Sequence, residues 1–204
     1  MTSPPGARAH LRSVTARLHE ETERVVDLAA RTSDLDAYRS LVAGLFGLHE
    51  PMEDHLAALP WHEAELDFAP RRKSALLRAD LRALGVDADT VPRCTDLPPV
   101  DTLAAGFGCL YVLEGSTLGG QLIAREAQQR LGLGPSDGAG FFASYGAGVG
   151  RMWRSFVHAL DDFVTTPDQL DEATRAAEAT FEAFQHWMST PVAPFLSPLS
   201  APTS

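Results

Sequence analysis

Apolar residues recur every three or four positions along most of the chain, which is the period of amphipathic helices. One such stripe runs through residues 8–31, and a second runs through residues 35–56. Ser33 or Asp34 is expected to cap the second helix, which should end near Pro60. No alternating segment is long enough to predict a sheet. The pattern therefore predicts an all-α protein.

Further helical stripes complete this picture. They predict helices over residues 70–84, 101–133, 149–164 and 168–188. Segments rich in proline or glycine separate these helices and are expected to be surface connections. We expect one helical domain over residues 8–188, a flexible N-terminus over 1–7 and a flexible tail over 189–204.

The predicted long helix contains an unusual run of glycines in the stretch "LYVLEGSTLGGQLIARE", residues 110–126. Each interior glycine costs about 0.5–1 kcal/mol relative to alanine, so Gly115, Gly119 and Gly120 need a reason. On a helical wheel, Gly115 and Gly119 share one side with Gly108 and Tyr111. Such a side could receive a planar ligand against bare backbone. Close helix packing and a simple kink explain the spacing equally well.

His19 lies at the edge of the first apolar stripe, with Arg12 and Glu23 within roughly 40° of it on a helical wheel. A histidine at such an edge is commonly structural, but its two charged neighbours favour a ligand. Glu23 could hold the imidazole by a hydrogen bond, as carboxylates do for metal-bound histidines. Arg12 would lie about 10.5 Å away along a straight helix, a spacing that suits the edge carboxylates of an iron macrocycle. His49 falls within an apolar stripe and is expected to pack in the core.

Composition narrows the class of protein. The 204 residues are 45% hydrophobic and carry a formal net charge of −10, which suits a globular domain and argues against nucleic-acid binding. Cys94 and Cys109 are too few for a disulfide scaffold. No run of about twenty apolar residues is present, and the first residues lack the apolar stretch of a secretory signal. We therefore expect a cytoplasmic protein that does not bind membranes.

Two motifs together resemble a known family. The stretch "LRSVTARLHEETE" (11–23) resembles the proximal-helix signature of heme oxygenases, and "LYVLEGSTLGGQ" (110–121) resembles their glycine-rich distal helix. The match is closest to the bacterial biliverdin-producing type that supplies chromophore to bacteriophytochromes. The resemblance implies a single-domain helical bundle that holds heme b between a proximal N-terminal helix and a kinked distal helix.

The resemblance also implies roles for individual residues. His19 would be the axial ligand of the heme iron, supported by Glu23. Arg12, Tyr111 and Arg154 resemble the contacts to the heme propionates. Gly115, Gly119 and Gly120 would form the distal surface. Ser116 stands where many family members carry an aspartate that orders water, so this chain offers a hydroxyl in place of that carboxylate.

The implied reaction is the cleavage of heme to biliverdin, expected to be the IXα isomer, with release of Fe(II) and carbon monoxide. It would consume O₂ and electrons from a ferredoxin or an NAD(P)H-dependent reductase, and a bacteriophytochrome could accept the product. Two alternatives remain open, a non-catalytic heme carrier or sensor and a thiaminase-like hydrolase of related fold. The hydrolase would need Cys109 as its nucleophile, although this residue is better suited to apolar packing.

Overall fold

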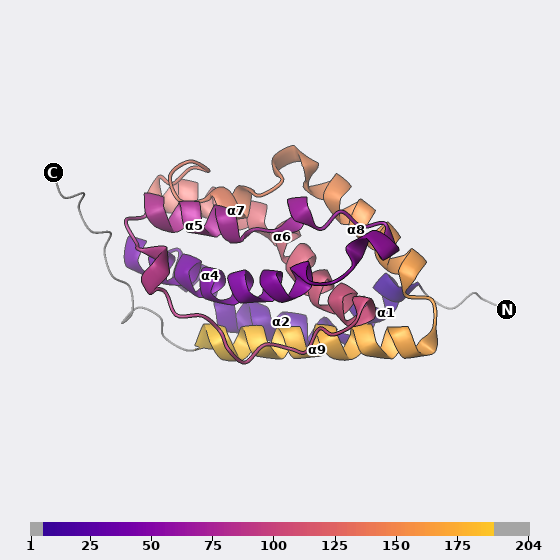
Figure 1. Ribbon diagram of the computed structural model, residues 1–204. Coiled ribbons are helices and arrows are strands. Elements are labelled where there is room, and N and C mark those ends of the chain that lie inside the picture. Colours follow the sequence, from indigo (N-terminus) through magenta and orange to yellow (C-terminus); the bar gives the residue numbers. More distant parts are fainter. Residues whose placement is uncertain (1–5, 190–204) are drawn as a thin grey trace.

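The structure, a computed structural model, describes residues 6–189, and these residues contain helices and no β-strand (Figure 1). This confirms the predicted all-α class. The α-helices are α1 (Ala7–Val14), α2 (Ala16–Val26), α3 (Leu28–Arg31), α4 (Leu35–Ala57), α5 (Ser74–Ala83), α6 (Leu103–Leu131), α7 (Gly140–Ala143), α8 (Val149–Phe163) and α9 (Pro167–Ser189). Short 3₁₀ helices are η1 (Trp61–Ala64), η2 (Ala69–Arg71), η3 (Ala88–Thr90) and η4 (Gly146–Gly148). None of the helices in this part of the chain is long and apolar enough to cross a membrane.

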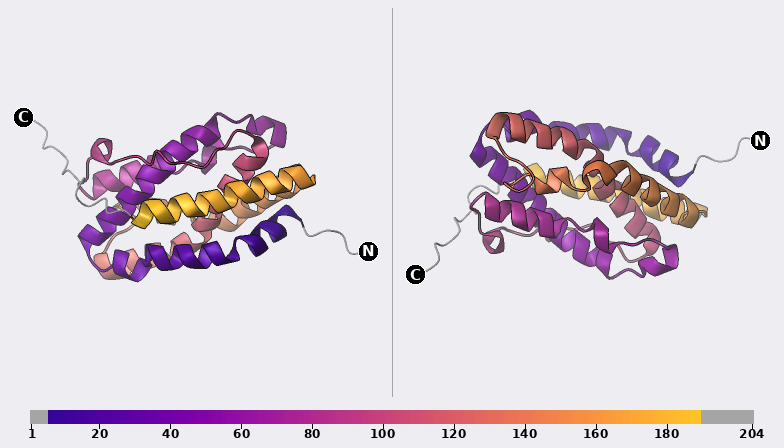
Figure 2. Two further views of the ribbon diagram at one scale, coloured as in Figure 1. Left: turned by 90° about the horizontal axis from the view of Figure 1, so that it is seen from below. Right: turned by 90° about the horizontal axis from the view of Figure 1, so that it is seen from above.

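Helix α9 is the element on which the others are assembled. Seen from below, it lies between α1 and α2 on one side and α4 on the other (Figure 2, left). Helix α6 packs along α9 over a long contact, and α8 packs against both α1 and α6. Helices α2 and α6 thus share α9 as a support, while they do not pack closely on each other within the described residues.

The core consists of two adjoining apolar clusters. One gathers side chains from α1, α8, α9 and the first half of α6, with Phe107 and Phe156 fully buried. The other lies between α4, α5 and α7, with Tyr38 and Phe46 fully buried. Phe184 and Trp187 of α9 pack against both clusters. These residues therefore form one continuous packed unit.

The predicted caps and bounds agree closely with the structure for the later helices. Asp34 caps α4, since its Oδ1 accepts from the backbone N–H groups of Asp36 and Ala37. These bonds hold the pKa of the Asp34 carboxyl below its usual value. Apart from Gly6, Ala7 and Ser189, the predicted terminal segments lie outside the described residues. Helix α1 begins at Ala7, one residue before the predicted start.

The first stripe is not one helix, as its periodicity suggested, but three. Thr15 separates α1 from α2, and its Oγ1 donates to the carbonyl of Leu11 at 2.7 Å, a back-bond that commonly bends helices. Asp27 ends α2 in the left-handed conformation at φ 38°. Arg12 and His19 consequently lie on different helices, so the spacing calculated for a straight helix does not apply to them. The apolar period survives because each short helix still faces the same core.

Candidate functional site

The imidazole of His19 is on the surface of α2. Its side chain is 62% exposed, and its Nδ1 lies 3.7 Å from Glu23 Oε1, within ion-pair range. The ring of Phe181 from α9 meets it edge-on, with centroids 6.1 Å apart. Gln185 fixes the backbone beneath, because its Nε2 donates to the Leu18 carbonyl at 3.0 Å. His19 is therefore held on a fixed helix while its Nε2 stays accessible to a ligand.

The open part of the glycine face lies near the middle of α6. A methyl group added at Gly119 would meet no atom within 4 Å, and one at Gly115 would reach ordinary contact with Trp153 at 3.9 Å. Leu118, directly before Gly119, and Leu122, three residues after it, are 45% and 59% exposed. An apolar surface with bare backbone is thus uncovered on this helix.

The other two glycines serve packing. A methyl group on Gly108 would lie 2.0 Å from the carbonyl oxygen of Ala173, so Gly108 allows α6 to cross α9 closely. One on Gly120 would lie 2.9 Å from the carbonyl oxygen of Phe142 in α7. Of the two explanations that the sequence left open, close packing is therefore the one that holds for Gly108, because α9 covers that end of the helix. The two explanations of the glycines, ligand face and close packing, hold for different residues.

Two arginines of α1, Arg8 and Arg12, act on the Tyr111 hydroxyl. Burial raises the pKa of the Tyr111 hydroxyl, against the opposing effects of the neighbouring Thr15 hydroxyl and of Arg8 and Arg12. The Tyr111 ring also packs on Trp153 of α8, with centroids 5.9 Å apart. Arg154 follows Trp153 directly and is exposed. Within residues 6–189, neither Arg12 nor Arg154 has a carboxylate partner, so both are available to an anionic ligand.

Ser116 is exposed on α6, but its hydroxyl proton is engaged. Oγ donates to the carbonyl of Leu113 at 2.7 Å, three residues earlier in the same helix. Its lone pairs remain available, so Ser116 can accept a hydrogen bond from a water molecule. It cannot replace a carboxylate as a proton source.

A polar cluster buried beside α6 was not predicted. A cavity of about 10 Å³, room for one water, is lined by His49, Glu53, Phe68, Arg71, Lys73, Leu110, Leu113 and Glu114. His49 is buried as expected and meets Phe141 edge-on, while its Nδ1 lies 3.4 Å from Glu53 Oε1. Burial lowers the pKa of Lys73 to about 8, although Glu114 and Glu53 oppose this shift. The sequence signal that could have indicated this cluster is Glu114, a carboxylate within an apolar run.

Cys109 is fully buried in the core between α6 and α9, and burial raises the pKa of its thiol. A thiol held neutral and away from solvent is a poor nucleophile. The expected apolar packing is confirmed, and the cysteine chemistry of a hydrolase has no support.

An uncovered helix backbone, an accessible imidazole and unpaired arginines together suit a flat, metal-containing ligand with acidic edges. Comparison with known proteins points to the same chemistry. Residues 6–190 match the family model described as heme oxygenase. The chain is 30% identical over 176 residues to a heme oxygenase of Xanthomonas campestris pv. campestris (strain 8004), a match covering 79% of this chain and 94% of that protein. It is 27% identical over 190 residues to heme oxygenase PigA of Pseudomonas aeruginosa, covering 89% and 93% respectively.

Solved structures share the fold. The NO- and CO-bound heme oxygenase of Neisseria meningitidis superposes with a TM-score of 0.80 at 21% identity, over 91% of each chain. Heme oxygenase-1 of the cyanobacterium Synechocystis sp. PCC6803, in complex with heme, superposes with a TM-score of 0.72 at 16% identity, over 90% of this chain and 91% of that one.

Proposed function

The chain belongs to the heme oxygenase family, and from this premise we propose how its own residues bind heme and direct its cleavage to biliverdin IXα, Fe(II) and carbon monoxide. The observation that carries the proposal is the uncovered backbone at Gly119, beside the exposed Leu118 and Leu122. A soluble helix gains stability when alanine replaces an exposed glycine, so an open glycine there suggests a surface kept bare for a ligand.

The residues present fit heme. His19 would ligate the iron through Nε2, and the Glu23 carboxylate, 3.7 Å from Nδ1, would help to orient the ring from its other side. Gly115 and Gly119 would lie over the opposite face, where a side chain would collide with the macrocycle. Arg12, Tyr111 and Arg154 would bind the propionates through charge-assisted hydrogen bonds. Gly120 contributes indirectly, by letting α6 approach α7.

Bound heme supplies both the iron at which O₂ is reduced and the macrocycle that is oxidised. The protein's part is positioning. Arg12 and Arg154 would hold the propionates and so fix the rotation of the macrocycle, which would decide the meso carbon that reacts. Ser116 accepts from a water molecule and so orders solvent, leaving proton supply to that solvent. Trp153 packs at Gly115 and limits the space on the distal side.

We further propose that the electrons come from a ferredoxin or an NAD(P)H-dependent reductase in the cytoplasm. A bacteriophytochrome is the proposed acceptor of biliverdin, on the strength of the resemblance between the two motifs and those of phytochrome-associated enzymes.

A single titration tests the proposal. Hemin added to the purified protein should give a one-to-one complex, and ascorbate in air should then bleach the heme absorption band while a biliverdin band and carbon monoxide appear. A complex that keeps its heme band under these conditions is a carrier or sensor. Failure to bind hemin at all would refute the site.

A further inference from the structure

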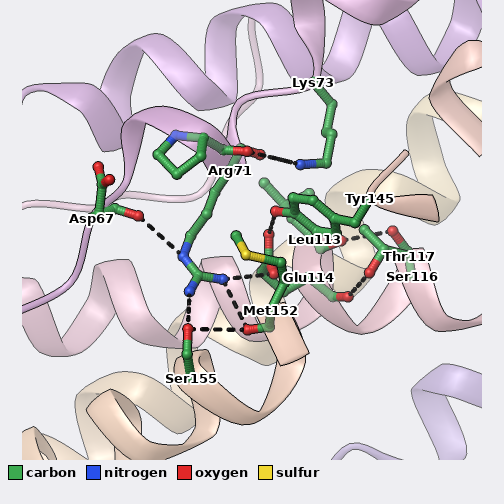
Figure 3. Close-up of polar contacts among 11 residues, drawn as sticks. Asp67, Arg71, Lys73, Leu113, Glu114, Ser116, Thr117, Tyr145, Met152 and Ser155 are labelled. Carbon is green, nitrogen blue, oxygen red and sulfur yellow. Dashed lines mark hydrogen bonds and ion pairs between the residues drawn. The ribbon is translucent and has the colours of Figure 1, made fainter. Parts of the chain in front are cut away.

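The carboxylate of Glu114 is buried one residue before Gly115, inside the wall of the proposed heme site. Both of its oxygens are engaged, as Figure 3 shows. Oε2 accepts from Arg71 Nη1 at 2.8 Å, and Oε1 accepts from the Tyr145 hydroxyl at 2.6 Å. Only 2% of either the Glu114 or the Arg71 side chain is exposed. The position of α6 at this point is therefore fixed by directional polar contacts.

Arg71 connects α6 to α8. Besides Glu114, its Nη1 donates to the Met152 carbonyl at 3.3 Å, and its Nη2 donates to Ser155 Oγ at 2.8 Å. Its Nε donates to the Asp67 carbonyl at 3.2 Å, which anchors the guanidinium to the segment before η2. A planar guanidinium with all three nitrogens engaged has one orientation, so it holds its partners in one arrangement.

The α8 contacts of Arg71 flank the residues that face the proposed heme site. Trp153 and Arg154 lie between Met152 and Ser155, and the Trp153 ring is the side chain nearest to Gly115. One guanidinium consequently holds the residue before Gly115 and the turn of α8 that faces it.

Tyr145 adds a second tie between α6 and the start of α8. It directly precedes η4, which leads into α8, and its hydroxyl donates to Glu114. Lys73 Nζ lies 3.6 Å from the centre of the Tyr145 ring and donates to the Arg71 carbonyl at 3.0 Å. The cluster of Arg71, Glu114, Tyr145 and Lys73 thus spans three segments of the chain.

A buried ion pair is seldom a better stabiliser than an apolar pair of the same volume, because both charges lose their hydration. What such a pair adds is a defined geometry, because its hydrogen bonds are directional. We propose that Glu114 and Arg71 are positioning residues, which set the separation of α6 and α8 at Gly115 and Trp153 and so the depth of the distal side. The contacts of Glu114 and Arg71, here called the clamp, are present in the protein without heme. Their effect on the depth of the distal side rests on the proposed function.

The test replaces the pair and not one partner, since a lone buried charge would only unfold the protein. Arg71→Met/Glu114→Met should melt at or near the temperature of the parent. In the ligand-free variant, amide hydrogen exchange at Gly115 and Gly119 should be at least about tenfold faster. Arg78→Met removes a half-exposed arginine of α5 from its ion pairs and should leave that exchange unchanged.

Loaded with heme, the double variant should give a shifted Fe–C–O vibration in its ferrous carbon monoxide complex and a mixture of bilin isomers. A folded double variant with parental exchange and a parental vibration would overturn the proposal, since the pair would then only stabilise the fold.

If the double variant does not fold, Tyr145→Phe provides the test, because it removes one hydrogen bond to Glu114 and keeps the ion pair. It should speed exchange at Gly115 by about threefold or more, and unchanged exchange would refute the clamp. A parent that binds no heme would refute the proposed function, while exchange in the ligand-free protein would still judge the clamp.

Discussion

The two sides of α6 differ in exposure and in the pairing of the charges around them. Around Gly119 the helix is bare, its leucines are exposed, and the arginines of α1 and α8 that the proposal assigns to the heme propionates are unpaired. Around Glu114, five residues earlier and on another side, the charges of Glu114 and Arg71 are buried and paired with each other. The open side gives up folding free energy to keep a surface free, and the closed side fixes the helix that carries it. Recognition and positioning are therefore divided between the two sides of one helix.

The largest effect is expected from His19 of α2, the proposed iron ligand opposite the open side of α6. His19→Ala should abolish the five-coordinate ferrous heme spectrum expected of the parent and lower turnover by about two orders of magnitude or more, because His19 is the proposed ligand of the iron. Free imidazole should restore part of both. Absorption spectra and bilin yield measure this, with His62→Ala, an exposed histidine of η1, as the control. Parental spectra in His19→Ala would remove this residue from the site.

The glycines separate the two sides most directly. Gly119→Leu places a side chain where no atom lies within 4 Å, so heme affinity should fall by about 5–160-fold, from roughly 1–3 kcal/mol of overpacking against the macrocycle. Gly119→Ala should raise the unfolding free energy of the ligand-free protein by about 0.5–1 kcal/mol. Hemin titration and urea unfolding measure the two quantities.

Gly120→Ala is the matched comparison, because its added methyl group would lie 2.9 Å from the Phe142 carbonyl. It should lower the unfolding free energy by about 1–3 kcal/mol, even though it stands next to Gly119 in the sequence. Equal effects of the two alanine substitutions on stability would contradict the division of the glycines between ligand and packing.

Arg154 tests whether the unpaired cations at the open side orient heme. Arg154→Ala removes a charge-assisted contact worth about 1.5–3 kcal/mol, so further heme rotations should become populated. Chromatography of the products should change from nearly pure biliverdin IXα to a mixture. Arg175→Ala, an exposed arginine of α9, should keep the parental product. Pure IXα from Arg154→Ala would assign the orientation to apolar contacts.

The closed side should give a small effect, a pH dependence of stability. The pKa of Lys73 is about 8 in the folded protein, against 10.5 as the ordinary value. Above pH 8 the unfolded chain holds this proton more tightly than the folded one, so stability should rise with pH, by about 1 kcal/mol between pH 7 and pH 9. Urea unfolding at both pH values should show this gain in the parent and lose it in Lys73→Met. A gain of equal size in the variant would place its origin elsewhere.

The sequence alone determined the long helices and the residues that could face a ligand. The 3.6-residue period of the apolar stripes predicted α4, α6, α8 and α9 to within a few residues, because that period is a local property of the backbone. Asp34 was recognisable as a cap for the same reason. The motifs around His19 and Gly115 identified the family, which the comparisons confirm.

The tertiary structure decided what periodicity cannot express. Gly108, Gly119 and Gly120 are alike as residues, and only the positions of α7 and α9 make two of them packing residues and leave one open. The break at Thr15 depends on a side-chain back-bond that competes with a continuous helix. Arg71 and Glu114 are 43 positions apart, so nothing local indicates that they meet. Contacts between distant segments arise from tertiary packing, which the local periodicity of a sequence does not reveal.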